Sequence, residues 1–166
     1  MEDDKVPFRV LFLCTGNSAR SVFAEYFLRH LGGKRFEVHS AGASPSGTVN
    51  PIALEVLRER FQIDAHDTRS KSWDEFKEVE FDFVITVCDN ARETCPVWPG
   101  QPIIGHWGVD DPAAFVGPPE SRKHFFHQVA LRLHRRVQLL VALPLEKLSR
   151  LEIEKATREI GAVDDR

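Results

Sequence analysis

The stretch VLFLCTGNSARS at residues 10–21 decides the fold that this sequence predicts. Its first part belongs to the run Phe8–Leu13, which is apolar apart from Arg9, has apolar residues on both faces and is too short for a helix. Such a run is typical of a central strand in a parallel sheet, where both faces are buried. From Ser21 onward, apolar residues recur at helical spacing until Gly32-Gly33, a typical end of a helix. The chain therefore opens with a strand, a short polar loop and a helix.

The rest of the sequence repeats this alternation of strands and helices. We expect further strands at Phe36–His39, Phe81–Val87 and Pro102–His106, and further helices at Pro51–Phe61 and Glu120–Leu143. The order predicts an α/β fold in which helices cover both faces of a central, parallel, four-stranded sheet, a single-domain three-layer sandwich.

Residues 8–143 are expected to form this domain, after an N-terminal extension at residues 1–7. Pro144 breaks the long helix and begins a charged extension at residues 144–166, whose apolar residues between Leu145 and Ile160 partly follow a helical pattern. That segment is interpreted first as an extra packing or solvated helix, with a dimer contact as the alternative.

Composition narrows the class of protein. The 166 residues carry a formal net charge of −3, which gives no basic surface for nucleic acid. The acidic N-terminus has no signal-peptide pattern, and no segment is apolar enough to span a membrane, so we expect a cytoplasmic protein. Three cysteines are too few for a disulfide scaffold and are either reactive thiols or buried apolar residues.

The loop after the first strand has the composition of an anion site. Cys14 ends that strand and Arg20 begins the next helix, at the edge where parallel sheets bind ligands. The helix N-terminus and the guanidinium should favour the thiolate of Cys14, as a nucleophile requires. Ser18 or Ser21 could donate a hydrogen bond to the sulfur, although Ser18 could equally cap the helix. The expected tetrahedral oxyanion site consists of Thr15, Gly16, Asn17, Ser18, Ala19 and Arg20.

The Cys-x5-Arg spacing, with Val10–Ser21, Ala24-Glu25 and Ser40-Ala41-Gly42 around it, resembles the low-molecular-weight tyrosine phosphatase family. The resemblance covers most of residues 8–142 and implies the same fold. It also implies that Asp111, the aspartate before Pro112, is the acid that protonates the leaving group. Its neighbour Asp110 is assigned to starting the turn or capping the next helix.

A second set of residues resembles the thioredoxin-coupled arsenate reductases that share this fold. It comprises the segments VITVC at 84–88, CP at 95–96 and HWGVDDPA at 106–113. The resemblance implies a relay in which Cys14 attacks arsenate, Cys88 attacks Cys14 as arsenite leaves, and Cys95 then takes over the disulfide. Tyrosine phosphatases of this fold usually carry aromatic residues after the acid, whereas Ala113-Ala114 stand here.

Arsenate reduction is therefore the leading prediction. Hydrolysis of phosphomonoesters through a Cys14 phosphocysteine is the alternative, and a non-catalytic oxyanion- or redox-sensing module is a third. The expected partners are an arsenate or phosphate oxyanion and an external thiol reductant, thioredoxin or similar, with no bound cofactor.

No metal is predicted. Some relatives hold potassium through residues that match Asn17, Glu25 and Ser40, but Arg69 or Lys71 could supply the positive charge here. The histidines show no metal-binding spacing beside the cysteines, and the tryptophans are interpreted first as packing residues, with Trp107 at the mouth of the site as a further option.

Overall fold

A parallel sheet lies at the centre of the molecule, which is described here for residues 6–163 from a computed structural model. Its strands are β1 (Phe8–Cys14), β2 (Phe36–Gly42), β3 (Phe83–Thr86) and β4 (Ile103–His106), in the order β2-β1-β3-β4. Residues Val10–Leu13 of β1 are fully buried, because apolar side chains on both faces pack against helices. The predicted four-stranded sheet is confirmed.

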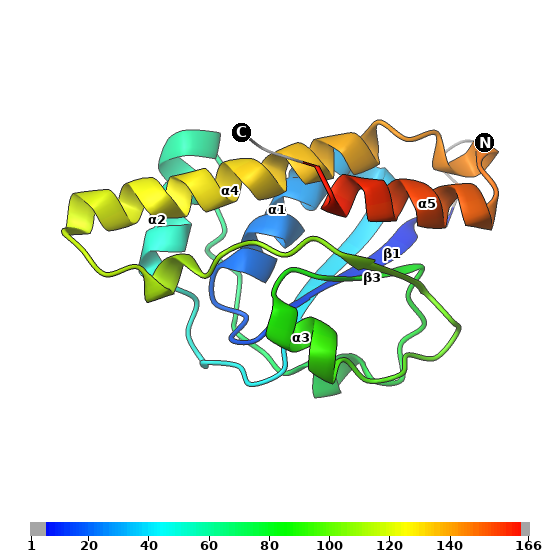
Figure 1. Ribbon diagram of the computed structural model, residues 1–166, viewed down its shortest axis with the longest axis horizontal. Coiled ribbons are helices and arrows are strands. Elements are labelled where there is room, and N and C mark those ends of the chain that lie inside the picture. The colour runs from blue at the N-terminus through cyan, green and yellow to red at the C-terminus, as the bar shows by residue number, and fades with distance from the viewer. Residues whose placement is uncertain (1–5, 164–166) are drawn as a thin grey trace.

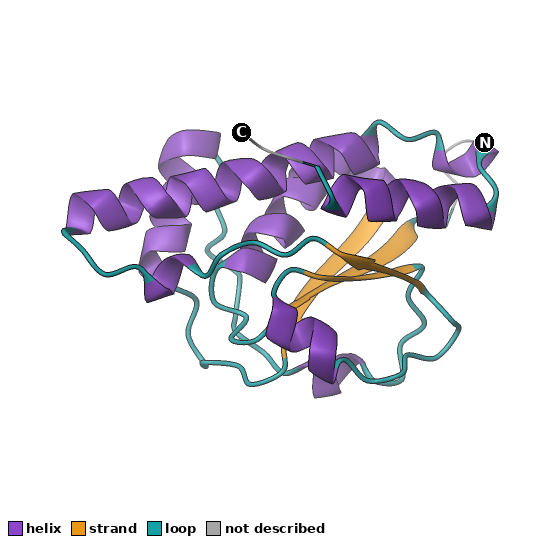
Figure 2. Ribbon diagram, in the orientation of Figure 1, coloured by secondary structure: helices purple, strands orange, loops and turns teal. Residues whose placement is uncertain are grey.

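Helices cover both faces of this sheet, which confirms the three-layer α/β fold (Figures 1 and 2). The helices are α1 (Arg20–Gly32), α2 (Pro51–Phe61), α3 (Asp89–Thr94), α4 (Pro119–Val141) and α5 (Arg150–Gly161). Short 3-10 turns complete the set: η2 (Gly33–Arg35), η3 (Trp73–Phe76), η4 (Pro112–Ala114) and η5 (Leu145–Lys147). In Figure 1, α4 and α5 run along one side of the strands and α3 lies on the other.

Besides shifts of one or two residues at β4 and α4, the elements differ from the prediction at three places. The strand predicted at Phe36–His39 continues to Gly42, because it pairs with β1 along its whole length. The strand predicted at Phe81–Val87 is limited to β3, Phe83–Thr86, where both neighbouring strands are present. The polar stretch after Cys88, for which no element was predicted, forms helix α3.

The C-terminal segment packs on the edge of the sheet. A capping box formed by Ser149 and Glu152 starts α5, and the helix buries Ile153, Thr157 and Ile160. Gly105 of β4 leaves room for this helix, because a Cβ there would lie 2.7 Å from Cγ2 of Thr157. The apolar face of α5 is therefore covered by its own sheet. Within residues 6–163, no helix is long and apolar enough to cross a membrane.

The carboxyl ends of the strands gather the candidate site. Cys14 ends β1, Cys88 follows β3, and the segment 107–111 follows β4. Because parallel strands point the same way, their following loops meet at one edge of the sheet.

Candidate active site

The nucleophile position is the sulfur of Cys14, which is almost completely buried. Its Sγ lies 2.9 Å from Oγ of Ser21 and accepts a hydrogen bond from the backbone N–H of Asn17 at 3.2 Å. Asn17 adopts a left-handed conformation with φ of 47°, which curls the loop back toward the sulfur. The loop thus supplies donors to a thiolate, and the hydroxyl that was predicted to contact the sulfur is that of Ser21.

The last residue of β2 and the two residues after it support the nucleophile loop. The backbone N–H groups of Ala43 and Ser44 donate to the carbonyls of Cys14 and Thr15. Gly42 lies directly under the loop, where a Cβ would be 2.5 Å from the Thr15 carbonyl oxygen and 3.0 Å from the Asn17 nitrogen. Only glycine allows this approach, so the loop is held in shape by its own scaffold.

A buried polar network fixes Asn17 and balances a buried carboxylate. Nδ2 of Asn17 donates to Ser21 and to Ser40, and the hydroxyl of Ser40 donates to Glu25 at 2.6 Å. Glu25 is only 3% exposed and forms an ion pair of 2.6 Å with Arg29, one helical turn further along α1.

Arg69 and Lys71 are the two side chains that the sequence suggests as the source of positive charge near Glu25. Arg69 pairs instead with Glu75, and Lys71 donates its backbone N–H to Asn17 Oδ1. Burial lowers the pKa of the Lys71 ammonium, and the charge of Glu25 acts in the opposite direction. Arg29 therefore makes the ion pair with Glu25. No cluster of three metal-ligating side chains occurs within residues 6–163.

Arg20 spans the cavity between the nucleophile loop and the predicted acid. Its guanidinium donates to the Val109 carbonyl at 3.4 Å and lies 3.8 Å from Oδ2 of Asp111. The structure thus places Arg20 beside Asp111, and both line the cavity that the residue after Cys14, Thr15, also lines.

The role assigned to Asp110 and one of the two alternatives for Ser18 are wrong. Asp111, rather than Asp110, caps the following turn, because its Oδ1 accepts from the backbone N–H of Ala113; Asp110 faces Arg132 at 3.8 Å. Ser18 does not cap α1, whose first flanking residue is Ala19 and which has no side-chain cap. Ser18 instead accepts from the Asn50 N–H through its carbonyl.

The tryptophan next to this loop is a packing residue, not part of the mouth of the site. Trp107 is fully buried, and its Nε1 donates to the carbonyl of Thr157 in α5. Arg136 of α4 donates to the Trp107 and Gly108 carbonyls. Hydrogen bonds therefore connect the loop that carries the acid to both α4 and α5.

The second cysteine lies beside the nucleophile loop. Sγ of Cys88 caps α3, accepting from the Ala91 N–H at 3.4 Å, and lies 3.3 Å from Oγ1 of Thr15. Nδ2 of Asn90 donates to the same Thr15 hydroxyl at 3.1 Å, which leaves the hydroxyl proton free to point at Cys88. Thr15 can therefore donate to the sulfur, as the Ala91 N–H does.

The third cysteine stands at the opposite end of α3. Sγ of Cys95 accepts a hydrogen bond from Trp98 Nε1 at 3.2 Å. Burial raises the pKa of the Cys95 thiol, and the tryptophan donor partly offsets this. All three cysteines are free thiols.

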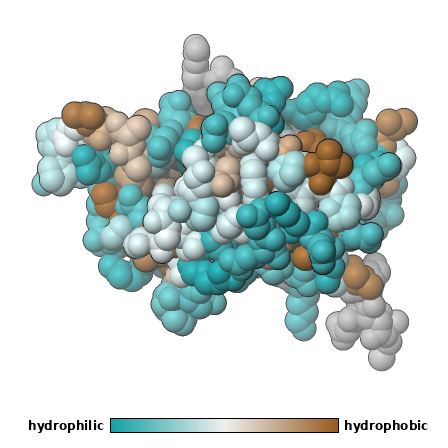
Figure 3. All heavy atoms as spheres, turned by 90° about the horizontal axis from the view of Figure 1, so that it is seen from below, coloured by the Kyte–Doolittle hydropathy of each residue, from teal (hydrophilic) through white to brown (hydrophobic). Residues whose placement is uncertain are grey.

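A cavity of about 520 Å³ opens over this arrangement. Its polar lining includes Thr15, Arg20, Cys88, Asp89, Asn90, His106, Asp110, Asp111 and Arg132. The face on the α3 side of Figure 1 is mainly hydrophilic, with scattered rather than continuous hydrophobic residues (Figure 3). Such a cavity suits a small polar anion rather than an apolar ligand.

Fold and site together define a family. Residues 9–153 match the family model described as low molecular weight phosphotyrosine protein phosphatase, and this chain belongs to that family. Among curated relatives, the arsenate reductase of Oceanobacillus iheyensis is 36% identical over 130 residues, which cover 78% of this chain and 92% of the relative.

Solved structures agree with this assignment. An arsenate reductase in the phosphate-binding state is 30% identical with a TM-score of 0.68, over 81% of this chain and 97% of that one. The thioredoxin-dependent arsenate reductase Cg_ArsC1' of Corynebacterium glutamicum is 26% identical with a TM-score of 0.56, over 82% of this chain and 64% of that one.

The sequence did not predict two sets of contacts near Cys88. Thr15 contacts Cys88 and Asn90, and Asp89 contacts His106. Asp89 and Asn90 directly follow Cys88, and that adjacency was the only available signal. His106 ends β4, and its Nε2 lies 3.0 Å from Oδ1 of Asp89.

Proposed function

We propose that this protein reduces arsenate to arsenite, in arsenic detoxification, through a relay of Cys14, Cys88 and Cys95. The contact between Thr15 and Cys88 carries the proposal, because it puts a second thiol directly beside the nucleophile loop. Hydrolysis of a phosphate ester does not require such a thiol. The similarity to arsenate reductases supports the same reaction.

In the first step the Cys14 thiolate attacks arsenate held by the loop amides and Arg20. Asp111 protonates the departing oxygen, which leaves as water, so that an arsenic–sulfur bond replaces an arsenic–oxygen bond. The separation of 3.8 Å between Arg20 and Oδ2 of Asp111 supports this role for Asp111.

In the second step Cys88 attacks the sulfur of Cys14. A Cys14–Cys88 disulfide forms, the arsenic–sulfur bond breaks, and its electron pair remains on arsenic, which departs as arsenite. The contacts with the Ala91 N–H and the Thr15 hydroxyl hold the Cys88 sulfur beside the nucleophile loop for this attack.

The third step requires α3 to unwind. Cys88 and Cys95 flank a six-residue helix, and seven steps of about 1.5 Å separate them by roughly 10 Å. A disulfide needs Cα atoms within about 7 Å. The helix that holds both thiols in the reduced protein must therefore open before Cys95 can attack Cys88.

The resulting Cys88–Cys95 disulfide must then be reduced from outside. An external thiol reductant, thioredoxin or similar, fits this need, and the thioredoxin-dependent relative supports it. Free thiols of this kind persist in a reducing compartment, so we infer a cytoplasmic enzyme without a bound cofactor.

A single turnover tests the proposal. Fully reduced protein is given one equivalent of arsenate, released arsenite is measured, and mass spectrometry locates the disulfide. We expect close to one equivalent of arsenite and a Cys88–Cys95 disulfide. If no arsenite is released while an aryl phosphate is hydrolysed, the protein is a phosphatase and the proposal is wrong.

The raised pKa of Cys95 predicts a pH dependence for the third step. Below its pKa, the Cys95 thiolate fraction rises with pH, so disulfide transfer to Cys95 should accelerate from neutral to alkaline pH. Trp98→Phe removes the donor to the sulfur, which should raise the pKa further and slow transfer about fivefold at neutral pH. Quenched time courses of the two disulfides measure this. An unchanged pH profile in the variant would show that the tryptophan donor has no effect on Cys95.

A further inference from the structure

His106 and Asp89 connect the end of β4 to the start of α3. Nε2 of His106 lies 3.0 Å from Oδ1 of Asp89, and Nδ1 lies 2.8 Å from the hydroxyl of Thr86. A carboxylate only accepts hydrogen bonds, so Nε2 carries a proton and donates to Asp89. The histidine side chain is 24% exposed and the aspartate 84% exposed, so a fixed ring holds an otherwise solvent-exposed carboxylate.

The same histidine separates two cavities. The site cavity is lined by Cys88 and Asp89, and a second cavity of about 400 Å³ is lined by Cys95. His106 and Gly161 line both. A Cβ on Gly161 would lie 2.2 Å from the His106 carbonyl oxygen, so α5 closely supports the backbone of this wall.

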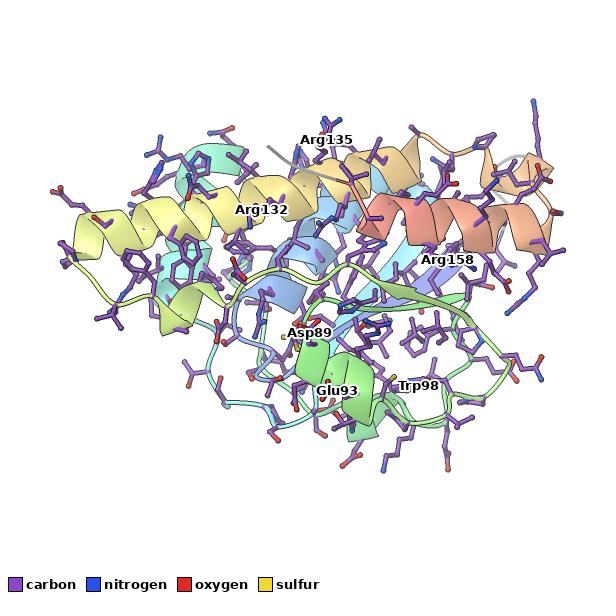
Figure 4. All side chains as sticks on the ribbon, viewed as in Figure 1. Asp89, Glu93, Trp98, Arg132, Arg135 and Arg158 are labelled. Carbon is purple, nitrogen blue, oxygen red and sulfur yellow. The ribbon has the colours of Figure 1, made fainter. Side chains whose placement is uncertain are left out.

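Figure 4 shows how the surrounding side chains are placed. Asp89 lies at the beginning of α3, Glu93 about one turn further along, and Trp98 beyond the end of that helix. Arg158 stands on α5, above the second cavity, which it also lines. Cys88 and Cys95 therefore line two different cavities, and His106 lies between these cavities.

We propose that His106 and Asp89 are positioning residues that restrain α3 and so slow the approach of the third thiol to the first two. Their contact holds the first turn of α3 against β4. It must break when α3 opens and Cys95 reaches Cys88. This inference rests on the proposed relay and adds to it a control on the timing of its third step.

The controlled step is a thiol–disulfide exchange. The Cys95 thiolate attacks the Cys88 sulfur, a Cys88–Cys95 bond forms, and the Cys14–Cys88 bond breaks. Cys14 leaves as a thiolate, and the proton given up by Cys95 balances its later protonation. No electrons are gained or lost overall, so the step needs no further reagent.

The cap that Cys88 forms on the Ala91 N–H also holds the first turn of α3, but this cap changes during the reaction. Once Cys88 is bonded to Cys14, its sulfur is a poorer acceptor for the Ala91 N–H, and the cap on α3 weakens. The His106–Asp89 contact involves neither sulfur and persists at that stage. It is therefore suited to setting how fast α3 opens.

A double-mutant cycle tests this inference, with Asp89→Ala, His106→Asn and the combined variant. Exposed charge-assisted contacts are weak, so we expect each single variant to accelerate transfer from Cys14–Cys88 to Cys88–Cys95 by about fivefold. The double variant should be no faster than either, since all three lose the same contact. Quenched single turnovers analysed by mass spectrometry give the rates.

Glu93→Gln is the matched control, because it removes a carboxylate from the same helix at an exposed position. We expect it to leave the transfer rate unchanged. Asp89→Ala also removes the favourable charge at the helix N-terminus. If that were the cause, Asp89→Ala would accelerate transfer equally in the His106→Asn background, and the inference would be wrong.

Amide hydrogen exchange of segment 88–95 in the reduced protein provides a second readout. The three variants should exchange about fivefold faster than the parent protein there, and Glu93→Gln should not. Unchanged exchange would overturn the inference even if the wild-type protein releases arsenite. Absence of arsenite from the wild type would overturn the proposed function instead, and exchange would still decide whether this contact restrains α3.

Discussion

Cys14→Ser is expected to abolish arsenite release and aryl phosphate hydrolysis together, each by at least about a thousandfold. Both reactions begin with attack by the same sulfur, and a serine hydroxyl has no neighbouring base in this loop to activate it. The donors around the sulfur, from Asn17 and Ser21, remain in place. Steady-state rates with arsenate and with an aryl phosphate measure the effect.

Phosphate binding provides the control for this variant. The loop is supported by Gly42 and by the backbone bonds of Ala43 and Ser44, none of which involves the Cys14 side chain. Cys14→Ser should therefore still bind phosphate in a calorimetric titration. A variant that binds phosphate and still releases arsenite would show that another group is the nucleophile.

Cys88→Ser is expected to separate the two chemistries. Arsenite release should fall by at least about a thousandfold, because no second thiol remains beside Cys14 to accept the disulfide. Hydrolysis of an aryl phosphate should remain measurable and should disappear when Cys14→Ser is added. Serine is a good helix N-cap, so the start of α3 should persist in the variant.

Cys95→Ser is the matched control for this experiment. It keeps the first two steps, so one equivalent of arsenite should still appear in a single turnover, and the disulfide should stop at Cys14–Cys88. Arsenite released at the parental rate by Cys88→Ser would show that Cys88 is not the attacking thiol.

The sheet and the long helices could be predicted because their signals are local. The run Phe8–Leu13 is apolar on both faces, and the helix at Pro51–Phe61 has the predicted bounds, with Asn50 capping it and proline at its first position. Helix α3 could not be predicted in this way. It has only six residues, five of them polar, and a cysteine cap, and a helix of that length depends on contacts made in the folded protein.

The reacting groups of the candidate site could be predicted from the sequence, but most of the contacts that hold the surrounding side chains could not. Cys14 and Arg20 are identified by their spacing along one loop. The partner of Glu25 is Arg29, four residues on, a spacing that sequence could have shown. The contact between Asp89 and His106 joins residues far apart in the chain, and which of Asp110 and Asp111 caps the turn depends on loop geometry. The Asp89–His106 contact and the capping role of Asp111 can therefore be recognised only in the folded structure.

The position of α5 has a consequence for the order in which the protein acquires its site. Residues 14–20 provide the nucleophile loop, whereas Gly161 lines the same cavity and Thr157 anchors the tryptophan before the acid loop. The two ends of the described sequence must therefore meet before the cavity is complete. Contacts of such long sequence separation form late in folding because loop closure opposes them. A growing or partly folded chain would already contain Cys14 but not the finished wall around it.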